Sequence, residues 1–99
     1  MNKTISTKVQ LNDNRTVMIY VEFYFDSSEG VKVDSWEMIN VTGLQGRHIL
    51  RQNGHNYINL ANLGPEDFQL LAEELTALCD KGDNYYDELE QNYIFERLA

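Results

Sequence analysis

Carboxylates are the side chains of this sequence whose number and spacing could do chemistry. Of the 16 Asp and Glu residues, ten fall within residues 66–99, where Lys81 and Arg97 are the only strong bases. Residues 1–65 hold six acids and six bases, so the formal net charge of −8 belongs to the last third of the chain. Such an uneven negative field repels nucleic acid and attracts basic surfaces on other proteins.

Two regular rows of acids are expected within this last third. On a helix that starts near Asp83, the side chains of Asp87 and Glu90 would follow on the same face, at rises of about 6 and 4.5 Å. A second row, at a spacing of seven, comprises Glu66, Glu73 and Asp80. Duplex DNA carries one charge per about 1.7 Å of axis, so carboxylate rows could occupy a cationic groove built for phosphates. The alternative interpretation is a solvated face that only keeps a small protein in solution.

Other reactive residue types predict no chemistry. His48 and His55 make at most half a zinc site, and no further ligand motif accompanies them, so we expect no metal and no cofactor. Cys79 is expected to be a small buried hydrophobic side chain. Because the sequence has neither a phosphate-binding glycine loop nor a Gly-x-Ser-x-Gly motif, we predict a non-enzymatic protein. A hydrolase that uses carboxylates is a third hypothesis, and it requires a pocket enclosing at least two acids.

The elements that position these residues begin with a predicted antiparallel sheet. Apolar residues alternate over 4–11 and most strongly over 17–25, and residues 12–15 have the composition of a turn. Residues 26–30 predict a second hairpin, in which Gly30 is available for a positive φ.

The sheet is expected to continue through two further segments. The apolar residues of 31–41 fall in conflicting phases, which a bulge between Asp34 and Glu37 would reconcile. An Asn-Gly dipeptide between two alternating arms, 48–51 and 55–60, then predicts a third hairpin.

One face of the strand at 17–25 is a second candidate site. If helices cover the other face, four residues point to solvent, namely Met18, Tyr20, Glu22 and Tyr24. Tyrosine combines a large contact area with a polar tip, which suits a dimer or partner surface. The alternative is that tyrosine is a good strand residue that is ordinarily half-exposed.

Two helices are expected after the sheet. Pro65, followed by two acids, indicates a helix start, and Gly82 occupies a position suited to a left-handed C-terminal cap. Asp83 and Asn84 could cap a second helix. Its apolar stripe comprises Tyr86, Leu89 and Tyr93, and its last turn is apolar all round through Tyr93, Ile94, Phe95 and Leu98, so we expect the sheet or another chain to cover that turn.

These elements predict one α+β domain spanning residues 1–99, with a β-rich part at 1–63 and an acidic helical layer at 64–99. The sheet would consist of hairpins of about four or five strands, packed on one face by two C-terminal helices. The predicted core comprises Ile5, Val9, Val17, Ile19, Val21, Phe23, Phe25, Ile58, Leu60, Phe68, Leu71, Leu75, Leu78 and Leu89.

A small acidic domain with a β-rich start and an acidic helical end resembles small phage or mobile-element proteins, including anti-CRISPR proteins and other DNA-mimic inhibitors. The resemblance covers the whole chain and rests on size, charge and order of elements. It implies inhibition of a host complex and, together with a single cysteine and no membrane-spanning or secretory segment, an address in the cytoplasm of a bacterial host.

The leading hypothesis is therefore a non-enzymatic inhibitor that occupies a basic, nucleic-acid-binding site on a partner protein, without binding nucleic acid or membrane itself. The partner-binding residues would be Asp80, Asp83, Asp87, Glu88 and Glu90, with Glu73 and Glu74 adding to the field and Tyr85 and Tyr86 beside them. The rival hypothesis is a structural or assembly module that forms a homodimer through the outer sheet face, with the acids serving only solubility.

Overall fold

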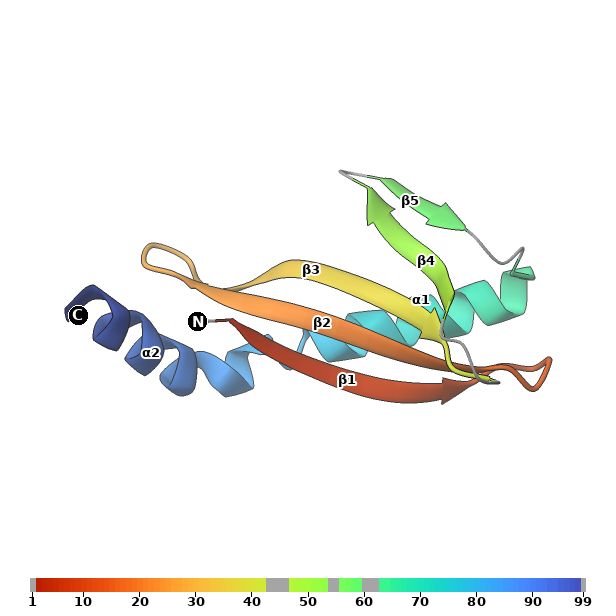
Figure 1. The fold of residues 1–99 in the computed structure, drawn as a ribbon, viewed down its shortest axis with the longest axis horizontal. Helices are drawn as coiled ribbons and strands as arrows, with labels where there is room; N and C mark the ends of the chain where they lie inside the picture. The colour runs from red at the N-terminus through yellow and green to blue at the C-terminus, as the bar shows by residue number, and fades with distance from the viewer. Residues whose placement is uncertain (1, 43–46, 54–55, 60–62, 99) are drawn as a thin grey trace.

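The chain has the α+β class that its sequence predicts, as the computed structural model in Figure 1 shows. The structure describes residues 2–42, 47–53, 56–59 and 63–98, and side chains for 2–42 and 63–98. The strands are β1 (Lys3–Gln10), β2 (Thr16–Asp26), β3 (Gly30–Asn40), β4 (Arg47–Asn53) and β5 (Asn56–Asn59). The helices are α1 (Pro65–Cys79), the short 3-10 helix η1 (Gly82–Tyr85) and α2 (Tyr86–Leu98).

The described strands form an antiparallel sheet in the order β1-β2-β3-β4-β5. The three long strands β1, β2 and β3 make the platform on which the helices lie, and the β4–β5 hairpin rises away from it (Figure 1). The pairing of Asn53 with Asn56 agrees with the hairpin expected there. The turn residues 54–55, and the expected inward positions of Ile58 and Leu60, lie outside the residues and side chains that the structure describes.

A β-bulge in β3 resolves the conflicting phases of its apolar residues. Val33 pairs with Phe23 and Ser35 pairs with Glu22, so Asp34 is the extra residue. The bulge therefore lies at the start of the predicted interval. Because antiparallel partners share a face of the sheet, the extra residue lets apolar side chains on both sides of it reach the inner face.

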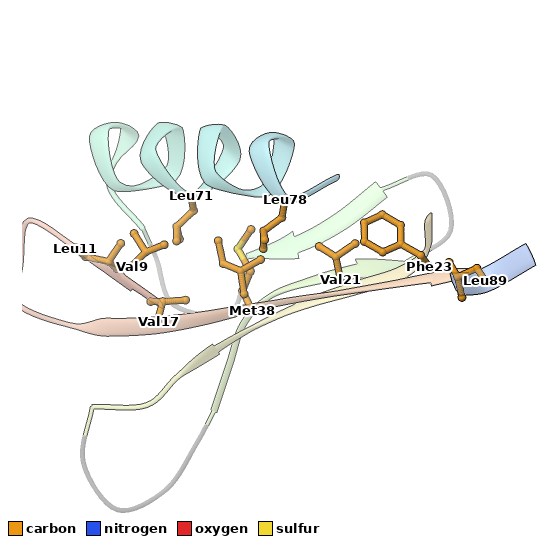
Figure 2. Close-up of a cluster of buried hydrophobic side chains, with 10 residues drawn as sticks. Val9, Leu11, Val17, Val21, Phe23, Met38, Leu71, Leu78 and Leu89 are labelled. Atoms are coloured by element: carbon orange, nitrogen blue, oxygen red, sulfur yellow. The ribbon is translucent and has the colours of Figure 1, made fainter. Parts of the chain in front are cut away.

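The core lies between the platform and the helices. Val17, Ile19, Val21 and Phe23 alternate along β2 and are fully buried, and Leu71 and Leu78 of α1 point toward them (Figure 2). The sequence interpretation left out two residues that are also buried, Leu11 and Met38. Four residues predicted as core are only partly buried and pack against it, namely Ile5, Phe25, Phe68 and Leu75.

The end of α1 differs from the expected left-handed cap. Asp80, with right-handed φ and ψ, is the C-cap residue, and the chain passes through Lys81 into η1. Gly82 serves another purpose there, because a Cβ atom at this position would lie 2.8 Å from Cε1 of the buried Phe23 ring. The close approach of backbone and ring, rather than a positive φ, explains the glycine. Gly30, in contrast, has the positive φ expected of it, at 86°.

The second helix packs on the platform through aromatic rings. Tyr85 stacks on Phe23 at a ring-centroid distance of 6.4 Å. Phe25 is contacted by Tyr86 at 5.4 Å and by Tyr93 at 5.2 Å. Together with the buried Leu89, these contacts attach the first two turns of α2 to the sheet.

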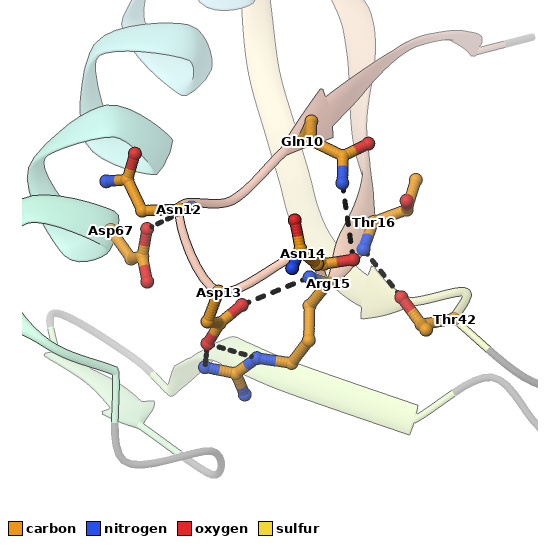
Figure 3. Close-up of polar contacts among 8 residues, drawn as sticks. All are labelled: Gln10, Asn12, Asp13, Asn14, Arg15, Thr16, Thr42 and Asp67. Carbon is orange, nitrogen blue, oxygen red and sulfur yellow. Dashed lines mark hydrogen bonds and ion pairs between the residues drawn. The ribbon is translucent and has the colours of Figure 1, made fainter.

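The β1–β2 turn is tied to the start of α1. Asp67 is 8% exposed, and its carboxylate accepts a 2.9 Å hydrogen bond from the backbone N–H of Asn12 (Figure 3). Within the turn, the guanidinium of Arg15 pairs with Asp13 at 2.6 Å. Asn14 at φ 71° completes the turn. Asp67 is thus an internal structural group, although the sequence placed it among the acids of the outer field.

Gly82 and Gly64 form a matched pair for a stability test. Gly82→Ala places a methyl group 2.8 Å from an atom of a ring that is 1% exposed, so the ring or the backbone must shift and we expect a loss of about 1–3 kcal/mol in the free energy of unfolding. Gly64→Ala meets no atom within 4 Å, and its effect should stay within about 0.5 kcal/mol. Urea unfolding monitored by circular dichroism measures both. Equal effects of the two substitutions would contradict the packing described here.

Candidate functional site

The acids that flank the bend between α1 and α2 form the main candidate site, which we call the acidic junction. It comprises Asp80, Asp83, Asp87, Glu88 and Glu90. The first four are exposed and Glu90 is half-buried. Upstream on α1, Glu73 is exposed and Glu74 is half-buried.

The predicted single row of Asp83, Asp87 and Glu90 on one helix is wrong. Asp83 lies in η1, and α2 begins only at Tyr86. The interpretation of Asp83 as a helix cap fails for the same reason, and no side-chain cap bond is present at the start of η1. Asp87 and Glu90, three residues apart in α2, do share a helix face. The row is therefore split at the bend, where Gly82 lies against the Phe23 ring.

The local electrostatics leave most of the junction unneutralised. Within residues 2–42 and 63–98, the one ion pair to the junction joins Lys3 Nζ and Glu88 Oε2 at 3.4 Å. Lys3 also lies 5.4 Å from the ring centroid of Tyr85. Two other bases are held by acids near them in the sequence, Arg15 by Asp13 and Lys32 by Glu29. Because these bases pair locally, they do not cancel the charge at the bend, where the five acids of the junction and Lys81 sum to a net charge of −4.

Part of the acidic junction also has a structural role. Asp87 and Glu88 lie in the first turn of α2, and Asp83 lies in the first turn of η1. Carboxylates at a helix N-terminus interact favourably with the positive end of the helix dipole, by about 0.3–1 kcal/mol at exposed sites. Asp80 and Glu90 do not occupy such positions, so the helix dipole does not account for them.

The tyrosines predicted beside the acids are partly used in packing. Tyr85 is half-buried against Phe23, and Tyr86, which packs on Phe25, is 39% exposed. A hydrogen bond with the Glu90 carboxylate, together with its negative charge, raises the pKa of the Tyr86 hydroxyl. The junction thus includes one tyrosine hydroxyl that a carboxylate holds in place.

The outer sheet face is the second candidate site. Met18, Tyr20, Glu22 and Tyr24 are all half-buried along β2, and because they alternate with the buried residues of that strand they lie on the face opposite the core. In the middle of this face the Asn2 amide donates to Glu22 Oε1 at 2.8 Å and lies 3.5 Å from Asp34 Oδ2. A hydrogen bond with Glu22 raises the pKa of the Asp34 carboxyl.

Sequence reasoning did not find this Asn2–Glu22–Asp34 cluster. Asp34 joins it because it is the bulge residue, and Asn2 joins it because β1 pairs with β2. The phase conflict in β3 was the available signal for the position of Asp34. It did not indicate which carboxylate the bulge brings close.

The remaining hollow, cysteine and histidines of the chain offer no catalytic or metal site within the described side chains. A hollow of about 340 Å3 on α1 is lined by Gln69, Ala72, Glu73 and Thr76, and it contains a single carboxylate. Burial, followed by the charge of Asp80, raises the pKa of the half-buried Cys79 thiol, which disfavours the nucleophilic thiolate. His48 and His55 fall outside the described side chains. Among the side chains that are described, no group of three metal-ligating residues occurs.

Comparison of the chain with known protein families, with curated proteins and with solved structures found no match. Within the described residues, neither helix has the length and apolar character needed to cross a bilayer.

The Tyr86–Glu90 contact predicts a specific titration. Because the folded state raises the pKa of Tyr86, this contact stabilises the fold at pH values below the unfolded-state pKa, and the contribution is lost as pH rises through the folded-state pKa. In a tyrosinate absorbance titration, Tyr86→Phe identifies the signal of this residue. Glu90→Ala should return that signal toward lower pH, whereas Glu73→Ala, which removes a carboxylate on α1, should leave it in place. An unchanged signal in Glu90→Ala would contradict the contact.

Proposed function

We propose that the protein is a non-enzymatic inhibitor that binds a basic surface on a partner protein through the acidic junction. The observation that supports it most is the state of Asp80, Asp83 and Asp87, which are exposed and make no ion pair within the described part of the chain. Exposed carboxylates on an otherwise charge-balanced domain give one strongly negative region.

The partner we favour is a component of a nucleic-acid-handling complex. A groove that binds phosphates carries Lys and Arg side chains. These bind a carboxylate much as they bind a phosphate, because both groups are negatively charged and both accept hydrogen bonds. Occupation of such a groove would inhibit the partner without any chemical step. This is the anti-defence activity of phage and mobile-element proteins, and the site of action would be the cytoplasm of a bacterial host.

The fold suits this role as a scaffold. We propose that the five-stranded sheet, packed on one face by both helices, serves to hold η1 and the start of α2 rigidly. Glu73 and Glu74 on α1 would extend the negative field along the helical layer. Such fields accelerate encounter with a basic partner and weaken as salt is added.

A fluorescein-labelled octa-arginine peptide provides a partner-independent test. We expect its dissociation constant for the wild-type protein to rise by at least about tenfold between about 50 and 300 mM NaCl. Asp83→Asn/Asp87→Asn should weaken binding by about threefold or more at low salt. The matched control, Asp13→Asn/Glu66→Gln, removes the same charge at the other end of the platform, where the β1–β2 turn meets the start of α1, and should change the dissociation constant by less than about twofold.

Fluorescence anisotropy measures all of these titrations. Binding that ignores salt would contradict the proposed function. Equal effects of the two double variants would show that net charge, and not the acidic junction, determines binding, and this too would contradict it.

The outer sheet face supports a second candidate function, a homodimeric assembly module. The observation that favours it is the column of Met18, Tyr20 and Tyr24, half-buried on the face opposite the helices. The Glu22–Asp34 pair opposes it, because a twofold contact would bring like charges together.

Light scattering distinguishes the two candidate functions, because only the assembly module requires a dimer. A homodimer through this face predicts that Tyr20→Ala/Tyr24→Ala halves the molar mass at a protein concentration of about 100 μM, a range in which weak dimers still form. Asp83→Asn/Asp87→Asn, which leaves the outer face intact, should retain the dimer mass. A monomeric wild-type protein at that concentration would exclude the assembly function.

A further inference from the structure

The last turns of α2 expose apolar side chains that the sequence led us to expect as covered. Ile94 is 43% exposed, Phe95 69% and Leu98 79%. We call these three residues the terminal patch. Figure 1 shows the end of α2 projecting past the platform. Tyr93, on another side of the helix, takes the contact with Phe25, so the patch is left without a described partner.

Helix geometry makes these residues one surface. Ile94 and Leu98 are four residues apart and Phe95 and Leu98 are three apart, so the side chains are neighbours. The same face continues toward the start of α2 through Gln91 to Asp87, at spacings of three and four. One stripe of α2 is therefore acidic at its beginning and apolar at its end, over about 16 Å at a rise of 1.5 Å per residue.

Charge indicates what kind of surface fits this stripe. Helix α2 contains four acids, Asp87, Glu88, Glu90 and Glu96, and one base, Arg97. A second copy of the chain laid antiparallel along it would place the acids of one helix on the apolar end of the other, so it matches neither part of the stripe. Large exposed apolar groups on a small acidic domain are typical of contact surfaces. The matching occupant has an apolar part and a basic part on one face.

We propose that the stripe of α2 docks an amphipathic basic helix of the partner, with apolar side chains on the terminal patch and Lys or Arg side chains beside Asp87 and the acidic junction. This inference rests on the proposed function and specifies the chemistry of the partner. The convex ridge of one helix packs well against another helix.

The orientation follows from the same charges. Apolar residues lie at the C-terminal end of α2 and acids at its N-terminal end, so an antiparallel partner helix would be apolar in its first half and basic in its second. Basic residues at a helix C-terminus are favoured by the helix dipole. Antiparallel packing also aligns the two helix dipoles favourably. The partner segment should therefore read as an apolar stripe followed by Lys or Arg.

A designed peptide tests this without knowledge of the partner. The probe is an end-capped helical peptide with a leucine stripe in its first half and lysines in its second, and the reference is a scrambled peptide of the same composition. We expect the ordered peptide to bind at least about tenfold tighter, because only it presents leucine and lysine to the matching parts of α2. Fluorescence anisotropy with labelled peptides measures the difference.

Variants of the patch identify the site. Phe95→Ala/Leu98→Ala should abolish the advantage of the ordered peptide and leave octa-arginine binding unchanged. Both side chains are mostly exposed, so the variant should keep its melting temperature to within a few degrees. The matched control is Val41→Ala, which truncates another exposed apolar side chain at 37% exposure, and it should change neither affinity.

The outcomes that overturn the inference differ from those that overturn the proposed function. If Phe95→Ala/Leu98→Ala binds the ordered peptide as the wild type does, while Asp83→Asn/Asp87→Asn weakens octa-arginine, the patch is not the docking site and the proposed function stands. If the octa-arginine tests fail but the patch variant still weakens peptide binding, the proposed function is wrong. In that case a further comparison decides the inference. If a neutral Leu/Gln peptide of the same pattern binds as tightly as the Leu/Lys peptide, the partner helix need not be basic and the inference fails as well.

Two further controls cover other occupants. Wild-type dimers in sedimentation experiments that Phe95→Ala/Leu98→Ala converts to monomers would show that a second copy covers the patch. Binding to phosphatidylcholine vesicles that the same variant abolishes would show that lipid does. Either result overturns the inference of a basic helix.

Discussion

The close packing of the Phe23 ring against the backbone at Gly82 fixes the chain between α1 and α2, and the surfaces that we propose as functional lie on either side of it. Phe23 is held in the core by its place in the alternating apolar face of β2, and the ring leaves no room for a side chain on the segment that crosses it. At this point the chain forms the 3-10 helix η1, between the end of α1 and the start of α2. Tyr85, Tyr86 and Tyr93 then attach α2 to Phe23 and Phe25. The acidic junction lies at this bend, and the terminal patch lies at the far end of the helix that the bend directs.

Local pairing explains why the acidic junction keeps its charge. Two bases in the first third of the chain pair with acids close to them in the sequence, Arg15 with Asp13 and Lys32 with Glu29. Such exposed pairs contribute little stability, about 0–1 kcal/mol each. They nevertheless pair the positive charges of Arg15 and Lys32 with acids at their own turns. Within the described residues, Lys3 alone extends from the sheet to the junction, and it does so at 3.4 Å from one carboxylate, that of Glu88.

The two faces of the platform have different physical roles. The inner face buries aliphatic and aromatic side chains under both helices, and it supplies the stability of the domain (Figure 2). The outer face carries methionine and tyrosines around the Glu22–Asp34 pair, whose carboxylates are close enough for one to raise the pKa of the other. A surface with a like-charge pair in its middle is a poor self-association site, whereas the acidic junction and the terminal patch carry the proposed contact with a basic amphipathic partner.

The sequence by itself determined the fold class, the alternation of β2, the start of α1 at Pro65 and the concentration of acids in the last third, because each of these depends on local periodicity or composition. Tertiary structure alone decided that Asp34 is the bulge residue, that Gly82 lies against a ring, and that Asp83 is separated from the α2 acids. It also decided that Asp67 is buried beneath the β1–β2 turn and that Phe95 and Leu98 stay exposed. These features arise from contacts between residues tens of positions apart, and a local sequence pattern does not specify which distant residue will be in contact.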